Sequence, residues 1–401
     1  MERVLTGRIL IVGAGQAGAR AAETVRAAGH RGEITLIGEE PHLPYERPQL
    51  SKDVLLGQNP TVVPIRDESY WKSLDIVLHV GAKAVECDPQ RREVRLADGR
   101  LFAYDQLLLT TGTAARRLPS LEGGAVPVLY LRTMEDAFAL KQVLRPGVNL
   151  VIVGGGVIGL EVAAAASVAG CAVTILEAAA TLLSRAFPKA ASEFLLRRHR
   201  AAGVEFIFEA SPQSIENGAV VLTNGKRVPA DIILVGIGAE PLTDLAQGMG
   251  LDAALGIKVD GFGRTEIPEV FAAGDVALQW DPLRSRWARV ETWANAQNQA
   301  IAVAKTIVGQ MTEYNDPPWF WTDQYETNLQ VVGDMGVGDV IVRGDPQSDR
   351  FTLLAIDEQI VRGALTVNRR PDMAALRKLV ASGRSVDRAN IENPAFDLRK
   401  I

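Results

Sequence analysis

Two glycine-rich turns, each following an apolar run and preceding an alanine-rich run, are the residues that most directly suggest chemistry. The first reads "GAGQAG" from Gly13 to Gly18, and the second reads "GGGVIG" from Gly154 to Gly159. Unpaired N–H groups at the start of a helix and the helix dipole favour an anion, and glycine lets a pyrophosphate approach closely. A single G-x-G-x-x-G is a weak signal, because glycines also serve close backbone packing. With strand, turn and helix expected around both copies, the sequence predicts two dinucleotide sites.

An acidic residue ends the second strand expected in each copy. These residues are Glu39 and Glu177. A carboxylate at this place can accept hydrogen bonds from both ribose hydroxyls but repels a 2′-phosphate, so Glu177 favours NAD over NADP. The alternative is a solvated acid at a strand end.

Glu161 differs from its counterpart in the first copy, which is Arg20. A carboxylate in the first turn of a phosphate-binding helix is repelled if it faces the phosphates, so we expect Glu161 to point elsewhere. The alternative is an acid that stabilises a helix N-terminus.

The elements that position these residues form two similar series. Each series begins with strand, glycine turn, helix and strand, and ends with a hairpin, an apolar strand and a glycine. The expected strands and helices are 9–12, a helix to about 28, 34–38, 149–153, 160–169 and 172–176, with the hairpin segments 93–112 and 219–238. Between the copies, "HLPYERPQLSK" has two prolines, Pro44 and Pro48, and is expected to be a loop.

The remaining chain is expected to complete the first nucleotide-binding domain and then to form a separate domain. The segment "VFAAGD" reads as a strand ending at Gly274 and Asp275, and a helix is expected over 292–308. After Pro317 and Pro318, strand-like runs and a late helix over 371–381 predict a smaller α+β domain.

Composition and charge exclude several classes of protein. With 47% apolar and 23% charged residues the chain is typical of a globular protein, and its net charge of -5 argues against a nucleic-acid binder. The apolar run over 148–176 is interrupted by glycines and Glu161, so no membrane segment is expected. The N-terminus lacks a signal peptide pattern, so a cytoplasmic location is expected.

Neither cysteines nor histidines suggest a metal. The two cysteines, Cys87 and Cys171, are far apart in sequence, and the four histidines lack ligand spacing. No metal site is expected.

The order of motifs resembles the FAD-dependent NADH:ferredoxin reductases that serve aromatic-ring dioxygenases and bacterial haem monooxygenases. The motifs are "GAGQAG", "LPYERPQLSK", "LLLTTG", "GGGVIGLE", "LVGIGAEP", "VFAAGD", "ETWANAQNQ" and "PPWFWTDQYE". The resemblance covers essentially the whole chain. It implies an α/β fold of the glutathione-reductase type, with two Rossmann-type domains and a C-terminal α+β domain. The implied divisions are 1–113 with 244–316 for FAD, 114–243 for NAD, and 317–401 for the third domain.

The resemblance also implies which residues hold the two nucleotides. A non-covalently bound FAD would contact Gly13, Ala14, Gly15, Gly18, Glu39, Arg47, Lys52, Ala84, Arg132, Asp275 and Trp293. NADH, as co-substrate, would contact Gly154, Gly156, Val157, Ile158, Glu161, Glu177, Arg185 and Gly238. Lys52, Glu161 and Trp293 would take part in catalysis, with Glu161 orienting the nicotinamide; for Lys52 the alternative is a surface lysine.

The chain lacks the cysteines that thiol-dependent relatives of this superfamily place beside the flavin, because residues 47–56 read "RPQLSKDVLL". The expected reaction is hydride transfer from NADH to FAD and then two one-electron steps outward. The implied acceptor is a small 2Fe-2S ferredoxin. A rubredoxin reductase or NADH oxidase would use the same sites, and a flavoprotein that binds a partner according to redox state, like the apoptosis-inducing factors, is a further alternative.

The C-terminal segment carries a local basic excess that could dock an acidic ferredoxin. From 369 to 401 there are eight basic residues (369, 370, 377, 378, 384, 388, 399 and 400) and four acidic ones (372, 387, 392 and 397). Docking and a simple solvated helix are equally compatible with this pattern. The run Trp319, Phe320 and Trp321 could lie between flavin and docking face or serve domain packing. The residues leave the oligomeric state open between monomer and homodimer.

Overall fold

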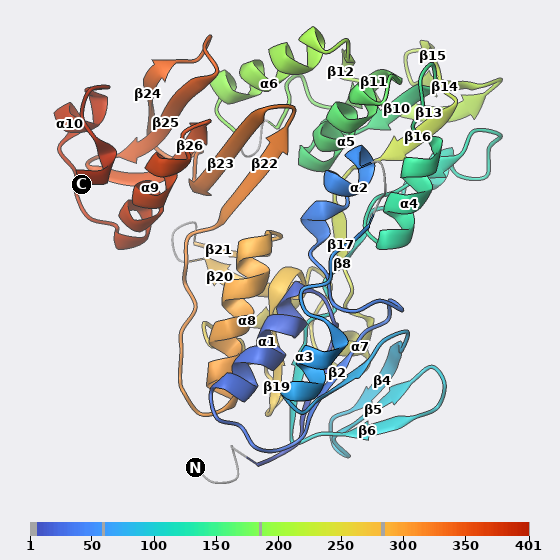
Figure 1. Cartoon of the computed structure of the whole chain (residues 1–401), viewed down its shortest axis with the longest axis vertical. Coiled ribbons are helices and arrows are strands. Elements are labelled where there is room, and N and C mark those ends of the chain that lie inside the picture. Colours follow the sequence, from blue (N-terminus) through green and yellow to red (C-terminus); the bar gives the residue numbers. More distant parts are fainter. Residues whose placement is uncertain (1–5, 58–60, 184–186, 282–284, 401) are drawn as a thin grey trace. The chain divides into compact units, whose positions relative to one another are not determined.

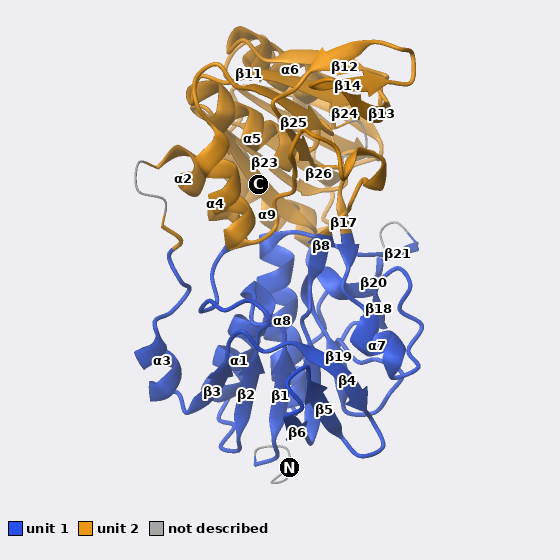
Figure 2. Cartoon of the chain, turned by 90° about the vertical axis from the view of Figure 1, so that its right-hand side faces the viewer, with its two compact units in different colours: residues 1–46, 63–114, 240–316 blue, residues 47–62, 115–239, 317–401 orange. Residues whose placement is uncertain are grey.

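A computed structural model describes residues 6–57, 61–183, 187–281 and 285–400 (Figure 1). The chain divides into two compact units (Figure 2). Unit 1 comprises residues 1–46, 63–114 and 240–316, and unit 2 comprises 47–62, 115–239 and 317–401. Residues 47–62, which the expected division placed with the FAD domain, group with unit 2. The chain also passes between the units within β8 (Thr113–Ala115) and β17 (Ala239–Pro241).

Unit 1 is built on a five-stranded parallel sheet, which the apolar runs of the sequence predict. Its strand order is β19 (Val270–Ala272), β7 (Gln106–Leu109), β1 (Ile9–Val12), β2 (Ile34–Ile37) and β3 (Ile76–His79). Every residue of β1, β2 and β19 is buried. A parallel sheet covered on both faces requires such continuous apolar strands.

Two helices of unit 1, α1 (Gln16–Ala27) and α8 (Trp293–Ile307), pack against each other. The fully buried Ala21, Ala22 and Ala300 belong to the core that these helices share with the sheet. The smaller elements of the unit are α3 (Glu68–Ser73), β4 (Ala84–Asp88), β5 (Glu93–Leu96), β6 (Leu101–Ala103), α7 (Asp244–Gly248), β18 (Ile257–Val259), a 3-10 turn (Gly274–Val276), β20 (Ala277–Asp281) and β21 (Arg286–Ala288).

Unit 2 contains a second parallel sheet of the same kind. Its order is β12 (Glu205–Phe208), β11 (Ala172–Glu177), β10 (Asn149–Val153), β16 (Ile232–Val235) and β9 (Val128–Leu129). The accompanying elements are a 3-10 turn (Arg47–Gln49), α2 (Asp53–Leu56), a 3-10 turn (Pro119–Leu121), α4 (Met134–Val143), α5 (Val157–Val168), α6 (Lys189–Ala201), β13 (Pro212–Glu216), β14 (Ala219–Leu222) and β15 (Arg227–Pro229). The predicted repetition of strand, turn, helix, strand, hairpin and apolar strand is therefore confirmed.

The C-terminal part of unit 2 is a five-stranded antiparallel sheet backed by a helix. Its order is β22 (Trp319–Gln324), β23 (Thr327–Gly333), β26 (Ile360–Val367), β25 (Arg350–Asp357) and β24 (Asp339–Asp345). Helix α9 (Arg370–Ser382) packs on β23 and β26, and α10 (Arg388–Glu392) and a final 3-10 turn (Leu398–Lys400) follow it. The α+β character predicted for this segment is confirmed.

The proline-rich segment before α2 differs from the expected loop. Pro48 lies in the 3-10 turn Arg47–Gln49, and α2 begins soon after it. Proline lacks an N–H and has a fixed φ close to the helical value, so it suits the first residues of a helical turn. Across the ranges described, no helix is long and apolar enough to cross a bilayer.

Candidate functional site

The first glycine turn combines two tightly packed glycines with one that faces open space. Gly13 has φ 113°, and a Cβ there would lie 2.1 Å from the Thr110 carbonyl oxygen. A Cβ at Gly18 would lie 1.9 Å from the Gly13 carbonyl oxygen, whereas one at Gly15 would meet no described atom within 4 Å. Gly15 is the N-cap of α1 and Ala14 lies beside it. This space at a helix N-terminus fits a pyrophosphate.

The second glycine turn has the same division of roles. A Cβ at Gly154, where φ is 105°, would lie 2.4 Å from the Gly236 carbonyl oxygen, and one at Gly159 would lie 2.2 Å from the Gly154 carbonyl oxygen. At Gly156, the N-cap of α5, the only described atom within 4 Å is 3.9 Å away. Val157 and Ile158 begin the helix. Gly238, with φ 111°, follows the neighbouring strand β16.

The two strand-end acids have different partners. Glu39 is exposed and forms an ion pair with Lys83, at 2.8 Å. Both carboxylate oxygens of Glu177 accept backbone hydrogen bonds, from Gly155 N–H and Ala179 N–H, each at 2.8 Å. Glu177 therefore braces the second glycine turn, a role that its position in the sequence did not indicate.

The other unit 1 residues expected at FAD lie in a turn or at the first residue of a helix or strand. Asp275 is in the 3-10 turn after β19, where the Gly274 N–H donates to the buried side chain of Gln299 at 2.8 Å. Trp293 opens α8, which Thr292 caps by accepting from the Asn295 N–H at 3.1 Å. Ala84 begins β4 and is half-buried.

Thr110 and Gln299 were not among the expected residues, although both brace unit 1 turns. The Thr110 hydroxyl donates to the Gly13 carbonyl at 2.8 Å. The "TTG" that follows the third strand and the "NAQNQ" run were the available signals.

Three residues expected at FAD, Arg47, Lys52 and Arg132, belong to unit 2. Arg47 donates to the carbonyl of Arg132. Arg132 lies beside the capping box of α4, where its N–H donates to Asp136 at 2.9 Å. Arg185, expected at NAD, lies outside the described residues.

Glu161 is the centre of a buried polar cluster in unit 2. Helix α5 begins at Val157, so Glu161 lies beyond the first turn, in which it was expected. Its side chain is only 4% exposed, and Lys52 Nζ lies 3.3 Å from Oε1. Ser51 donates to Oε2, and Thr322 donates to Oε1 at 2.7 Å. Ser51 and Thr322 are functional-site residues that were not predicted from the sequence.

Burial and the neighbouring donors act on Glu161 in opposite directions. Burial raises the pKa of Glu161, and Lys52, Ser51 and Thr322 lower it by a smaller amount. Lys52 also lies 3.4 Å from Asp323 Oδ2, so its ammonium bridges two carboxylates.

Aromatic rings extend this cluster toward the C-terminal sheet. The Lys52 ammonium is 5.5 Å from the centroid of the Trp321 ring, which stacks on Trp319 at 5.3 Å. The guanidinium of Arg377 lies 4.2 Å from the Trp319 ring. The aromatic run thus forms part of β22, which had not been predicted as a strand.

The basic C-terminal residues fall into two groups. Arg369, Arg370, Arg388 and Arg399 form ion pairs with carboxylates. Arg377, Lys378, Arg384 and Lys400 are exposed, and within the described ranges none of them is in an ion pair. The unneutralised positive charge is therefore on and after α9.

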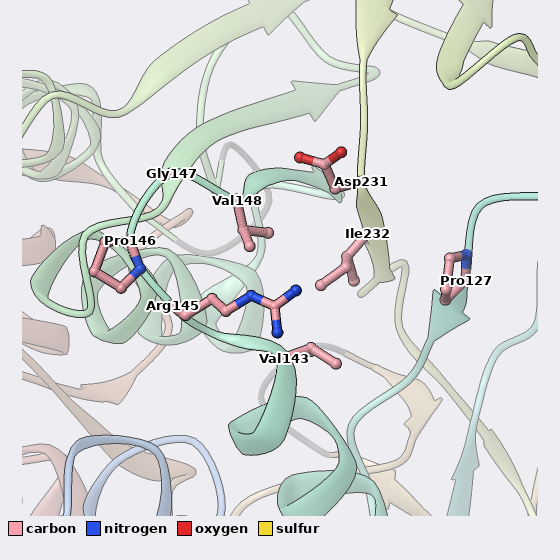
Figure 3. A pocket seen from close by; sticks show the side chains of 8 residues that line it. All are labelled: Pro127, Val143, Arg145, Pro146, Gly147, Val148, Asp231 and Ile232. Atoms are coloured by element: carbon pink, nitrogen blue, oxygen red, sulfur yellow. The ribbon is translucent and has the colours of Figure 1, made fainter.

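One cavity of unit 2 contains none of the expected site residues (Figure 3). It has a volume of about 500 Å³ and is lined by Pro127, Val143, Arg145, Pro146, Gly147, Val148, Asp231 and Ile232. It lies at the amino ends of β10 and β16, whereas the glycine turn follows the carboxyl end of β10. Within the described ranges no three His, Cys, Asp or Glu side chains converge as metal ligands.

Family models match nearly the whole chain. Residues 7–300 match "Pyridine nucleotide-disulphide oxidoreductase", and residues 319–401 match "Reductase C-terminal".

Curated relatives are similar over their full length. The chain is 44% identical to the ferredoxin–NAD(+) reductase component of the p-cumate 2,3-dioxygenase system of Pseudomonas putida, over 98% of each chain. It is 39% identical to the corresponding component of the anthranilate 1,2-dioxygenase system of Burkholderia cepacia, over 97% of this chain and 98% of the relative.

Solved structures give the same result. The chain is similar to putidaredoxin reductase in a covalent complex with putidaredoxin, with a TM-score of 0.94, 34% identity, and coverage of 98% of this chain and 97% of the other. A ferredoxin reductase for the CYP199A2 system of Rhodopseudomonas palustris matches with a TM-score of 0.93 at 34% identity, over 98% and 99% of the two chains. The chain therefore belongs to the pyridine nucleotide-disulphide oxidoreductase family, and within it to the ferredoxin–NAD(+) reductases.

Proposed function

We propose that this enzyme oxidises NADH and delivers the two electrons, one at a time, to a small 2Fe-2S ferredoxin that supplies an oxygenase. When bound, FAD would supply the hydride acceptor and the conversion from two-electron to one-electron transfer. The relatives support the assignment, because their names describe ferredoxin–NAD(+) reductase components of dioxygenase systems.

The observation that carries the proposal is the ion pair between Lys52 and Glu161, together with the absence of cysteine from the segment around Lys52. Thiol-dependent relatives need a reactive cysteine near the flavin, but residues 47–56 contain none. Cys87 and Cys171 are both buried, and burial raises the pKa of each thiol, which makes them poor nucleophiles. An ion pair at this place can orient a nicotinamide but cannot form a disulfide.

Unit 1 would hold FAD. The open space at Gly15, framed by Gly13, Ala14 and Gly18, would receive the pyrophosphate, and Glu39 would accept from a ribose. Asp275, Ala84 and Trp293 would contact the ribityl chain, adenine and ring system. The resemblance also assigns Arg47, Lys52 and Arg132 to FAD, and these three residues belong to unit 2.

Unit 2 would hold NADH. The N-terminus of α5, with Gly154, Gly156, Val157 and Ile158, would receive its pyrophosphate, with Arg185 and Gly238 as further contacts. Glu177 would accept from the ribose and disfavour a 2′-phosphate. Because its carboxylate already braces Gly155, its ribose contact would be preorganised.

The Lys52–Glu161 pair would orient the nicotinamide during hydride transfer, and Trp293 would pack beside the acceptor ring. Proper orientation of two reacting rings lowers the barrier because the ordering has been achieved on binding. Lys378, Arg384 and Lys400 would attract the acidic face of a ferredoxin.

A two-stage stopped-flow experiment tests the proposal. Purified holoenzyme is mixed with one equivalent of NADH without oxygen, and flavin bleaching is followed; a purified 2Fe-2S ferredoxin is then added. The expected result is fast bleaching and reduction of two equivalents of ferredoxin per NADH. Bleaching without ferredoxin reduction, but with rapid reoxidation by oxygen or by rubredoxin, would assign one of the alternatives instead. A long-lived reduced protein that reduces none of these acceptors would indicate a redox-dependent binding protein.

A further inference from the structure

A chain of buried side chains continues from Glu161 through the C-terminal sheet to α6, all within unit 2. Thr322, which donates to Glu161, accepts from the side-chain amide of Gln324 at 3.0 Å. The carbonyl oxygen of that amide lies 2.8 Å from His199 Nε2, and the Tyr325 hydroxyl lies 3.1 Å from His199 Nδ1. Thr322, Gln324 and His199 are at most 2% exposed.

Each member of this chain has its hydrogen-bonding role fixed by the next. An ionised Glu161 can only accept, so the Thr322 hydroxyl donates to it and its oxygen is left to accept from the Gln324 N–H. The amide oxygen then faces His199 and needs a donor, which places the imidazole proton on Nε2. Nδ1 is then an acceptor, and the Tyr325 hydroxyl donates to it. The four hydrogen bonds, donated by Tyr325, His199, Gln324 and Thr322, therefore all run in the same direction and end at the Glu161 carboxylate.

The chain orients groups but does not conduct protons. An amide does not readily pass a proton, because it would have to become an imidic acid, so Gln324 interrupts any proton relay. Burial lowers the pKa of His199 to about 4, so the imidazole is neutral near pH 7. Linked hydrogen bonds polarise one another, and a series directed at an anion strengthens the last bond.

Resting on the proposed function, we propose that Gln324 and His199 are positioning residues that direct the Thr322 hydroxyl at Glu161 and so keep its carboxylate ionised and oriented toward the nicotinamide site. The opposite direction of these hydrogen bonds shows what the chain contributes to Glu161. If the imidazole proton were on Nδ1, the amide would turn over, and the Thr322 hydroxyl would donate to Gln324 instead of Glu161. The carboxylate would then lose one of its few donors.

The charged groups around Glu161 do not duplicate this function. The loop before α2 contributes Lys52, and β22 contributes Asp323, which also pairs with Arg370 of α9 at 3.4 Å. Helix α5 also packs on β10 and β11, and the described residues of those strands place no charged group against Glu161. Without the Thr322 hydroxyl, the Glu161 carboxylate would therefore keep only the Lys52 ammonium and the Ser51 hydroxyl as the partners described above.

The tautomer of His199 gives a readout that does not depend on activity. Holoenzyme labelled with ¹⁵N-histidine contains only four histidines, and long-range ¹H–¹⁵N spectra distinguish the two neutral tautomers. We expect a single neutral His199 form with its proton on Nε2 from pH 8 to pH 5.5. Thr322→Val should convert this signal into a mixture of tautomers although Thr322 does not contact His199, and Thr322→Ser should preserve the single form.

The pH dependence of flavin reduction by NADH gives the second readout. Losing a hydrogen bond to the charged form raises a carboxyl pKa, so Thr322→Val should move the acidic midpoint of the rate upward by about 1 pH unit. Gln324→Leu, which keeps the hydroxyl but not its orientation, should move it upward by about half as much, while Thr322→Ser should move it by less than about 0.2 units. Thermal unfolding and FAD content of each variant show whether it is folded.

The outcomes separate this proposal from the proposed function. A proton on Nδ1 of His199, or an unchanged tautomer in Thr322→Val, overturns the positioning chain. An unmoved midpoint in folded Gln324→Leu also overturns it, since a merely structural glutamine would lower thermal stability without changing the pH profile. If NADH fails to reduce the flavin, the proposed function fails, but the tautomer spectra still decide whether the chain exists.

Discussion

Lys52 Nζ lies 3.3 Å from Oε1 of Glu161, a carboxylate in the middle of an otherwise apolar helix. The corresponding residue of the first copy, Arg20, instead forms an ion pair with Glu23 on its own helix at 2.7 Å. A buried carboxylate without a partner is costly, so the Lys52 pair is a feature that the fold must maintain. The two copies of the glycine turn therefore differ at this position, where Glu161 pairs with a lysine outside its own helix and Arg20 pairs within its own helix.

Flavin reduction by NADH should depend on the charge of Glu161. Because burial raises its pKa, the ionised form is present above that value, and the rate should fall as the pH decreases through it. Glu161→Gln should slow the reaction by about 10- to 100-fold, as expected for misplacing a reacting ring, and should remove this acidic limb. Stopped-flow bleaching between pH 5 and pH 8 measures both; a variant that keeps the wild-type rate and pH profile would show that Glu161 has only a structural role.

Gly156→Ala should weaken NADH binding without unfolding the protein. A methyl group there enters the space expected for the pyrophosphate but meets no described atom closer than 3.9 Å. The KM for NADH should rise by about tenfold, equivalent to about 1.4 kcal/mol, while FAD remains bound. Gly248→Ala, in α7, is the matched control and should leave the KM unchanged; Gly154→Ala should fail to fold because of its positive φ and a contact of 2.4 Å. Equal KM values for Gly156→Ala and wild type would remove the NADH site from this turn.

Glu177→Gln should reduce the preference for NADH over NADPH. The amide keeps one oxygen to brace the turn, but the negative charge that repels a 2′-phosphate is lost. The ratio of the two kcat/KM values should fall about tenfold, a change of about 1.4 kcal/mol in discrimination. Glu205→Gln removes the same charge from the exposed start of β12 and should not change the ratio. Equal reduction rates with NADH and NADPH in the wild type would contradict the role of Glu177.

Reversing the charges of Lys378 and Arg384 should weaken ferredoxin turnover only. Exposed charges steer an oppositely charged partner, so Lys378→Glu with Arg384→Glu should lower kcat/KM for ferredoxin by about tenfold at low salt and flatten its salt dependence. Reduction of a small neutral dye should be unaffected. Arg31→Glu with Lys226→Glu makes the same change of net charge at other exposed positions and is the control. Unchanged ferredoxin kinetics in the first double variant would place the docking face elsewhere.

His199 should make the fold sensitive to acid. Its pKa is lowered by burial to about 4, so between about pH 6.5 and pH 4 the unfolded chain takes up a proton that the folded chain does not. Stability is therefore lost as the pH falls through this window, by about 3 kcal/mol in total. His199→Gln should show a smaller decrease of the unfolding midpoint from pH 7 to pH 4.5, whereas His79→Gln, at a less buried site, should retain most of it. Identical acid sensitivity of wild type and His199→Gln would contradict a buried neutral imidazole.

Local sequence was sufficient for most of the fold. Continuous apolar strands, glycines at fixed spacing and alanine-rich helices are short-range signals, and they predicted both Rossmann-type units, the hairpins and the α+β character of the C-terminal segment. The antiparallel pairing of the C-terminal strands was not predicted. The prediction at Pro48 was wrong: the two prolines of residues 42–52 indicated a loop, but a proline also suits the start of a helical turn. The aromatic run at 319–321 was not predicted as a strand because three consecutive aromatic residues do not show the alternation of apolar and polar residues typical of a half-buried strand.

The sequence by itself determined the two glycine turns between strand and helix, because such a turn depends on residues that are neighbours in the chain. It also identified Glu161 as unusual, from its position in a phosphate-binding helix. Only the tertiary structure decided what Glu161 touches: Ser51 is 110 residues away and Thr322 is 161 residues away. It likewise decided that Glu177 braces its own turn while Glu39 pairs with Lys83. Side-chain partners across such separations depend on how helices and sheets pack, and no local pattern of residue types records that packing.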